Sequence, residues 1–171
     1  GIKGFFRWLS GRYPLIIRSF SDTSRPVINN LYIDFNQILF TAQKMCVDPE
    51  NNALLTNEAL RYLDSIVQLV RPTTLIFIAI DGTPPFNKIY NQRLGKHKNF
   101  WNNPPNFHGE GVYPDLALFF PGTPFIHNFQ KELRDFIKNK TMNDAAWMNP
   151  QVIYSSVYNP GESEHKIFEF I

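Results

Sequence analysis

The sequence predicts an α/β fold in which a mainly parallel sheet is flanked by helices. Three observations predict it: short unbroken apolar runs, amphipathic helical patterns between them, and an acid that follows each run. Unbroken apolar runs suit strands that are buried on both faces of a parallel sheet. The predicted strands and the acids beyond them are, in chain order, Leu31–Ile33 before Asp34, Leu75–Ile80 before Asp81, and Val152–Tyr154 before Glu162 and Glu164.

Two helices are predicted between the strands. Apolar residues recur at spacings of three and four behind Thr56, a plausible N-cap. The same pattern follows Thr123, with Pro124 at the first helical position. Residues 99–121 are rich in Asn and Pro, which predicts a loop insertion at the surface.

The bulk composition bounds the class of protein. A chain of 171 residues with 43% hydrophobic residues fits one globular domain. The net charge of +2 permits a nucleic-acid partner without requiring one. Cys46 is the only cysteine, which excludes a disulfide framework and favours an intracellular location.

No membrane-spanning segment is predicted, because the longest strongly apolar run, Thr74–Ile80, is too short. Residues 1–20 carry four basic residues and no acid. A transit peptide or an interfacial helix would fit this pattern, but a docked terminal helix is the preferred interpretation.

The acids form the most informative constellation. In a parallel sheet ligands bind beyond the carboxyl ends of the strands, so carboxylates from three segments are expected to converge there. Such convergence needs a cation, and oxygen ligands favour Mg²⁺ or Mn²⁺. A metal pair held this way can activate water for phosphodiester hydrolysis. The alternative is that Glu162 and Glu164 only complement a helix N-terminus and that Asp81 only forms a turn. His165 is interpreted as a surface residue or as a neighbour of the metal ligands rather than as a ligand itself.

A basic segment, Asn87–Lys98, follows the second strand closely and contains no acid. A helix would place Lys88, Gln92 and Lys96 on one face, with Arg93 beside them. Such a face can hold a phosphate, although a solvated basic face is the plain alternative. With the acids nearby, the pattern indicates nucleic-acid hydrolysis at a phosphorylated end.

At this point the sequence resembles a known family, the 5′-to-3′ exoribonucleases of the XRN type. Five motifs occur in the family's order, namely GIKGFFRWLSGRYPLI, LYIDFNQILF, IAIDGTPPFNKIYNQR, FFPGTPFI and NPGESEHKIFEFI. The resemblance implies a PIN-like (flap-nuclease-like) core, two magnesium ions, and release of mononucleotides from RNA that bears a 5′-monophosphate. Residues 1–171 correspond to the N-terminal portion of that nuclease domain, so the core is expected to be incomplete at the C-terminus.

The resemblance assigns roles to residues of this chain. The acids that match metal ligands are Asp34, Asp81, Glu162 and Glu164. Lys88 and Gln92 match the 5′-phosphate pocket, Lys96 occupies one of its basic positions, and Arg93 lies beside them. It also implies that the N-terminal segment packs within the nuclease domain.

The sequence also departs from the family at several positions. Phe40 replaces a His that stacks on the leading base, and a Phe can still stack. Gly95 stands where an Arg of the phosphate pocket is usual, and Ser163 replaces the Gly between the paired glutamates. The chain ends before an Asp-x-Asp cluster that completes the family's metal site, so a two-metal site is expected only if such acids are supplied.

Two functional hypotheses therefore stand side by side. The leading one is a magnesium-dependent 5′-to-3′ exoribonuclease. The alternative is a degenerate, non-catalytic domain that acts as an RNA-binding or structural subunit of a larger ribonucleoprotein assembly. A DNA flap nuclease of the same superfamily fits the motifs less well. Cytoplasmic and nuclear members share these motifs, and the charge pattern leaves an organellar assembly open.

Overall fold

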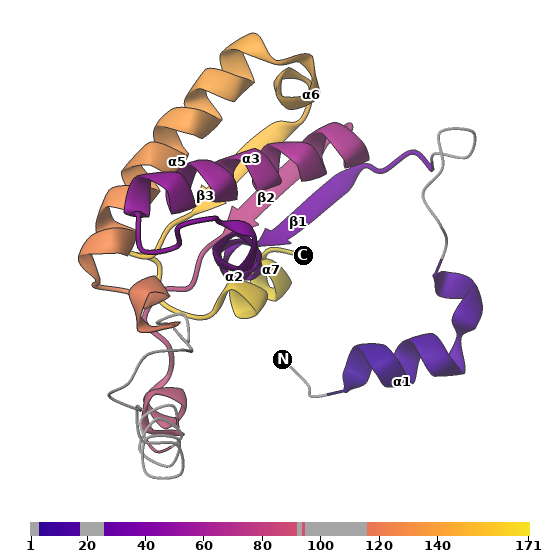
Figure 1. Ribbon diagram of the computed structural model, residues 1–171. Coiled ribbons are helices and arrows are strands. Elements are labelled where there is room, and N and C mark those ends of the chain that lie inside the picture. Colours follow the sequence, from indigo (N-terminus) through magenta and orange to yellow (C-terminus); the bar gives the residue numbers. More distant parts are fainter. Residues whose placement is uncertain (1–3, 18–25, 92–93, 95–115) are drawn as a thin grey trace.

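The computed structural model of the chain describes residues 4–17, 26–91, 94 and 116–171. At its centre lies a parallel sheet in the order β1-β2-β3 (Figure 1). Its strands are Asn30–Asp34 (β1), Leu75–Ala79 (β2) and Gln151–Ser155 (β3). The α/β fold and the parallel sheet predicted from the three apolar runs are therefore confirmed.

The strands are aligned at their carboxyl ends. Asp34 pairs with Ala79, and Ala79 pairs with Ser155. All five residues of β2 are buried, as its unbroken apolar sequence predicted, whereas β1 and β3 are partly accessible. The segments that follow the three strands consequently begin at one edge of the sheet.

Helices cover both faces of the sheet (Figure 1). The larger hydrophobic core lies between one face of the sheet and four helices. These helices are Phe35–Met45 (α2), Asn52–Val70 (α3), Pro124–Asn143 (α5) and Ala145–Met148 (α6). Ile76 and Ile78 of β2 point into this core, while Phe77 points to the opposite face. That face packs against Ile167 of α7, which spans Ser163–Phe170.

The predicted start of one helix agrees with the structure, and the predicted start of the other does not. Thr123 caps α5, since its hydroxyl accepts from the Ile126 N–H at 3.3 Å, as predicted. The predicted cap Thr56 is wrong: α3 begins one turn earlier, at Asn52. Asn51 is the N-cap, and Thr56 is buried inside the helix. A short side-chain amide just before the helix competes better for its free N–H groups than a Thr that faces the core.

The end of the predicted 99–121 insertion is packed into the domain. Residues 99–115 lie outside the described part of the chain, but Leu116–Phe119 form a short 3₁₀ helix, η2. Phe119 is buried, with its ring centroid 5.5 Å from that of Phe40 and 5.6 Å from that of Phe125. This aromatic contact joins η2 to α2 and α5.

The N-terminal segment is helical. It forms α1 (Phe5–Arg12) and a 3₁₀ helix, η1 (Pro14–Ile16). None of the residues of α1 is buried, so the predicted terminal helix is present but does not dock deeply on any described element. Within the described ranges, no helix combines the length and apolarity needed to cross a membrane.

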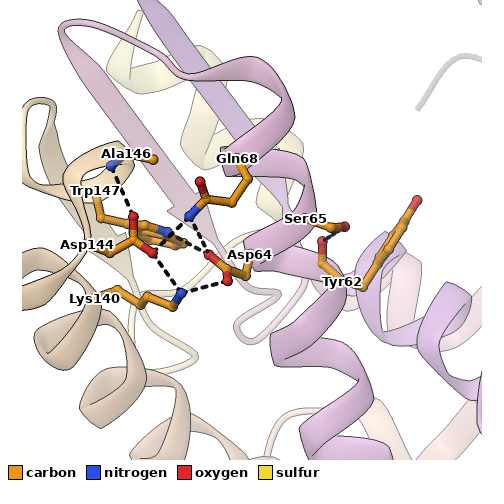
Figure 2. A network of polar contacts seen from close by, with 8 residues as sticks. All are labelled: Tyr62, Asp64, Ser65, Gln68, Lys140, Asp144, Ala146 and Trp147. Atoms are coloured by element: carbon orange, nitrogen blue, oxygen red, sulfur yellow. Dashed lines mark hydrogen bonds and ion pairs between the residues drawn. The ribbon is translucent and has the colours of Figure 1, made fainter.

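A polar network ties α3 to α5 and α6 at the end of the sheet where β3 begins (Figures 1 and 2). Lys140 donates to Asp64 at 2.6 Å and to Asp144 at 2.9 Å. The indole N–H of Trp147 donates to Asp64 at 2.9 Å, and Gln68 donates to Asp144 at 2.8 Å. We call these five residues the Lys140 network.

Candidate active site

The candidate site lies beyond the carboxyl ends of the strands. Asp34 ends β1 and also caps α2, because its carboxylate accepts from the Asn36 N–H at 3.0 Å. Asp81 follows the end of β2, and Glu162 is the N-cap residue of α7. Both sequence-based interpretations of these acids therefore agree with the structure: Asp34 and Asp81 lie at strand ends, and Glu162 lies at a helix N-terminus.

Backbone hydrogen bonds join the loop after β2 to the loop before α7. The Gly82 N–H donates to the Gly161 carbonyl at 2.9 Å, and the Gly161 N–H donates to the Thr83 carbonyl at 2.9 Å. A Cβ on Gly82 would lie 1.9 Å from the carbonyl oxygen of Asn159, so only glycine permits this approach. The two loops thus bring Asp81 next to the start of α7.

Asp81 is oriented by two residues that the sequence interpretation did not assign to the site. Its Oδ1 accepts from both the backbone N–H and the hydroxyl of Ser163, each at 2.7 Å. Its own N–H donates to the side-chain oxygen of Asn36 at 2.9 Å. Asn36 and Ser163 are buried polar residues within the predicted motifs, and that location is the signal that could have identified them.

A cavity of about 610 Å³ opens at this edge of the sheet. Of the residues predicted for the site, those that line it are Asp34, Phe40, Asp81, Lys88 and Glu164. The Phe40 ring is held from one side by Phe119. The predicted aromatic platform and three of the four predicted acids therefore surround one space.

The electrostatics of the cavity follow from this convergence. Burial raises the pKa of Asp34, and the neighbouring carboxylates of Asp81 and Glu164 raise it further. Hydrogen bonds from Ser163 and Asn36 act in the opposite direction without cancelling the shift. The two neighbouring carboxylates thus disfavour the ionisation of Asp34, a penalty that a bound cation would relieve.

The donors suit a hard divalent cation, although they do not complete its ligand set. Carboxylate oxygens are the ligands that Mg²⁺ and Mn²⁺ prefer. Across the described ranges, no three Asp, Glu, His or Cys side chains lie close enough together to form a metal-binding group. Further ligands would be needed to hold a metal tightly.

Glu162 lies apart from the other acids. It is buried and forms an ion pair with Lys88, and it does not line the cavity. A predicted metal ligand and the predicted phosphate-binding lysine are thus in direct contact, which the sequence did not indicate. His165 is exposed, as expected for a surface residue. Gln92, Arg93 and Lys96 lie outside the described residues.

Lys166 of α7 is a buried residue that bonds to the segments next to the candidate site. It is 7% exposed, and its Nζ donates to the carbonyls of Ile80 at 2.7 Å and Ser156 at 2.9 Å. Burial lowers the pKa of Lys166 to about 8, while Asp81 acts in the opposite direction. The sequence interpretation passed over this residue.

Comparison with known proteins agrees with the motifs. Residues 1–106 and 106–171 match the family described as XRN 5′-3′ exonuclease N-terminus. The chain belongs to the XRN family. This confirms the resemblance proposed from the five motifs.

Similar proteins include two yeast relatives that are both named 5′-3′ exoribonuclease 1. The Saccharomyces cerevisiae protein is 33% identical and the Schizosaccharomyces pombe protein 32% identical, each over the whole of this chain. The 5′-3′ exoribonuclease 2 of Gallus gallus is 32% identical, also over the whole chain. The chain spans 12%, 14% and 22% of the length of the S. cerevisiae, S. pombe and G. gallus proteins, respectively.

Proposed function

We propose that this chain forms part of the active site of a magnesium-dependent 5′-to-3′ exoribonuclease that degrades 5′-monophosphorylated RNA to mononucleotides. The observation that supports this most directly is that Asp34, Asp81 and Glu164 line one cavity together with Lys88 and Phe40. The names of the relatives support RNA as the substrate class. The parallel sheet flanked by helices is consistent with a PIN-like nuclease core.

In this proposal Asp34, Asp81 and Glu164 would hold Mg²⁺, and Glu162, which does not line the cavity, is the fourth candidate carboxylate. Mg²⁺ bound there would supply a water of lowered pKa and would neutralise charge on the phosphate. A two-metal site requires further carboxylates, which the family motif places in an Asp-x-Asp cluster.

The chain's own residues position the RNA. Lys88 binds the 5′-phosphate, with Gln92, Arg93 and Lys96 as the remaining members of that pocket. Phe40 stacks on the leading base, and stacking on an aromatic ring is tolerant of base identity. Because Lys88 also pairs with Glu162, the phosphate and the carboxylate compete for one ammonium group.

The test is digestion of 5′-monophosphorylated RNA by the purified protein with Mg²⁺, followed by analysis of the released mononucleotides. RNA of the same sequence with a 5′-hydroxyl end and the corresponding 5′-monophosphorylated DNA are compared in parallel. We expect Mg²⁺-dependent release from the phosphorylated RNA only. Equal cleavage of the DNA would instead favour a flap or 5′ nuclease.

A second candidate is a non-catalytic RNA-binding or structural subunit of a ribonucleoprotein assembly. It is favoured by one observation, that the described residues do not bring three metal ligands together. Binding of 5′-monophosphorylated RNA without turnover at any Mg²⁺ concentration would support this candidate over the enzyme.

A further inference from the structure

Lys166 is a buried cation to which the proposed chemistry assigns no role. Of the lysines that the structure describes, it is the only buried one. Its ammonium group donates to two backbone carbonyls, those of Ile80 and Ser156. These are strong charge-assisted hydrogen bonds, but they are made to main-chain groups rather than to a carboxylate partner.

The two carbonyls belong to the segments that lead into the site. Ile80 is the residue before Asp81, and Ser156 begins the loop after β3. The backbone of Lys166 itself belongs to α7, where its N–H donates to the Glu162 carbonyl at 3.1 Å. One side chain therefore connects three segments, two of which bear acids of the candidate site.

A packing role alone explains this residue poorly. Burying an ammonium group destabilises the fold, and an apolar side chain of similar volume often fills such a position at no loss of stability. What an apolar side chain cannot do is hold two carbonyls from different loops at a set separation. The two hydrogen bonds therefore explain why a lysine occupies this position, whereas the need to fill the volume does not.

We propose that Lys166 is a positioning residue that holds the loop bearing Asp81 against the first turn of α7, so that Asp81 and Glu164 face the cavity together. The meaning of this placement for metal binding rests on the proposed function. The role of Lys166 in holding the two segments together does not depend on the proposed function, and a separate experiment measures it.

The first measurement is amide hydrogen exchange at Ser163, whose N–H is bonded to Asp81. We expect Lys166→Met to raise the exchange rate of this amide at least about tenfold under native conditions. Lys140→Met is the matched control, because it removes a lysine from a polar network at the other end of the sheet. Faster exchange at Ser163 in both variants, or in neither, would overturn the proposal.

The second measurement is Mn²⁺ binding, followed by titration and electron paramagnetic resonance. The sign is decisive, since removing a nearby positive charge by itself would tighten Mn²⁺ binding. We expect Lys166→Met to weaken binding about tenfold because the carboxylates lose their alignment. Unchanged or tighter binding in this variant contradicts the positioning role. If the wild-type protein binds no Mn²⁺, the proposed function fails, while the exchange measurement still decides the role of Lys166.

A third measurement needs no variant and covers the case in which Lys166→Met does not fold. The Lys166 ammonium protons are held by two carbonyls and shielded from water. Nuclear magnetic resonance should show them exchanging with solvent at least about tenfold more slowly than those of the exposed Lys138. Equal rates at the two lysines would show that the hydrogen bonds do not persist in solution, and the proposal would be abandoned.

Discussion

The molecule contains two groups of acids that are built in opposite ways. In the Lys140 network, Asp64 and Asp144 each accept hydrogen bonds from Lys140 and from a neutral donor (Figure 2). The hydrogen bond from Lys140, and then that from Gln68, lower the pKa of Asp144. At the cavity the balance is reversed, and burial together with neighbouring carboxylates raises the pKa of Asp34.

This difference separates a structural role from a functional one. The acids of the Lys140 network have their counter-charge inside the protein, so they stabilise the contact between α3 and α5 without needing a ligand. Asp34 instead faces two further carboxylates, those of Asp81 and Glu164, at a cavity that a ligand can enter. The surroundings of an aspartate thus decide whether its pKa is lowered, as for Asp144, or raised, as for Asp34.

The largest expected effect is on activity, from Asp81→Asn. In the proposed exoribonuclease, loss of this carboxylate should lower kcat by roughly a thousandfold, corresponding to about 4 kcal/mol of transition-state stabilisation. Steady-state hydrolysis of 5′-monophosphorylated RNA measures it. Asp135→Asn, at an exposed position on α5, is the matched control and should leave kcat unchanged. Full activity in the Asp81 variant would remove this residue from the site.

The next effect is on stability, from Asp64→Asn. The substitution leaves Lys140 with one carboxylate partner and weakens the bond from Trp147. We expect a loss of about 2 kcal/mol in the free energy of unfolding, below the range for fully buried pairs because the network is partly accessible. Urea denaturation measures it. Glu58→Gln breaks the surface pair with Arg61 and should change the free energy of unfolding much less than Asp64→Asn does.

A smaller effect is expected from Ser163→Ala, which removes one of the two hydrogen bonds to Asp81 and keeps the backbone bond. The loss should be about 1 kcal/mol in the free energy of unfolding, the usual net contribution of one such bond. Urea denaturation again measures it. The exposed Ser65 on α3 offers the control, since Ser65→Ala should be neutral or slightly stabilising. Equal stability of the two variants would mean that the Ser163 hydroxyl does not bond to Asp81.

The smallest effect is the most direct test of the contrast between the two groups of acids. Asp34 has a folded-state pKa above its usual value, so the folded protein binds its proton more tightly than the unfolded chain does. Its ionised form therefore destabilises the fold, and stability from this group falls as pH rises through the folded pKa.

Asp34→Asn should accordingly raise stability slightly at neutral pH, because it removes the ionised form that burial and the neighbouring carboxylates disfavour. The gain should vanish at a pH below the ordinary pKa of Asp, where both states are protonated. Urea denaturation at pH 7 and at pH 3 measures the two cases. Destabilisation at pH 7 would place Asp34 with the compensated acids instead.

The sequence was a good guide to features that depend on local pattern. Apolar runs located β1, β2 and β3, and the acids that follow them were correctly expected at one edge of the sheet. The start of α3 was missed by one turn, because Thr56 has the chemistry of a cap while its position faces the core. The packed end of the 99–121 segment was missed since nothing local marks Phe119 as a core residue.

By itself the sequence determined the family, the parallel sheet and the places of the acids relative to the strands, because strand periodicity and motif order are local properties of the chain. Only the tertiary structure decided which partners those acids have. Ser163 bonds to Asp81, Lys88 pairs with Glu162, and Lys166 bonds to Ile80, and in each case more than seventy residues separate the partners. Charge balance is set by what folding brings within a few ångströms, so the distinction between the Lys140 network and the cavity acids becomes visible only in three dimensions.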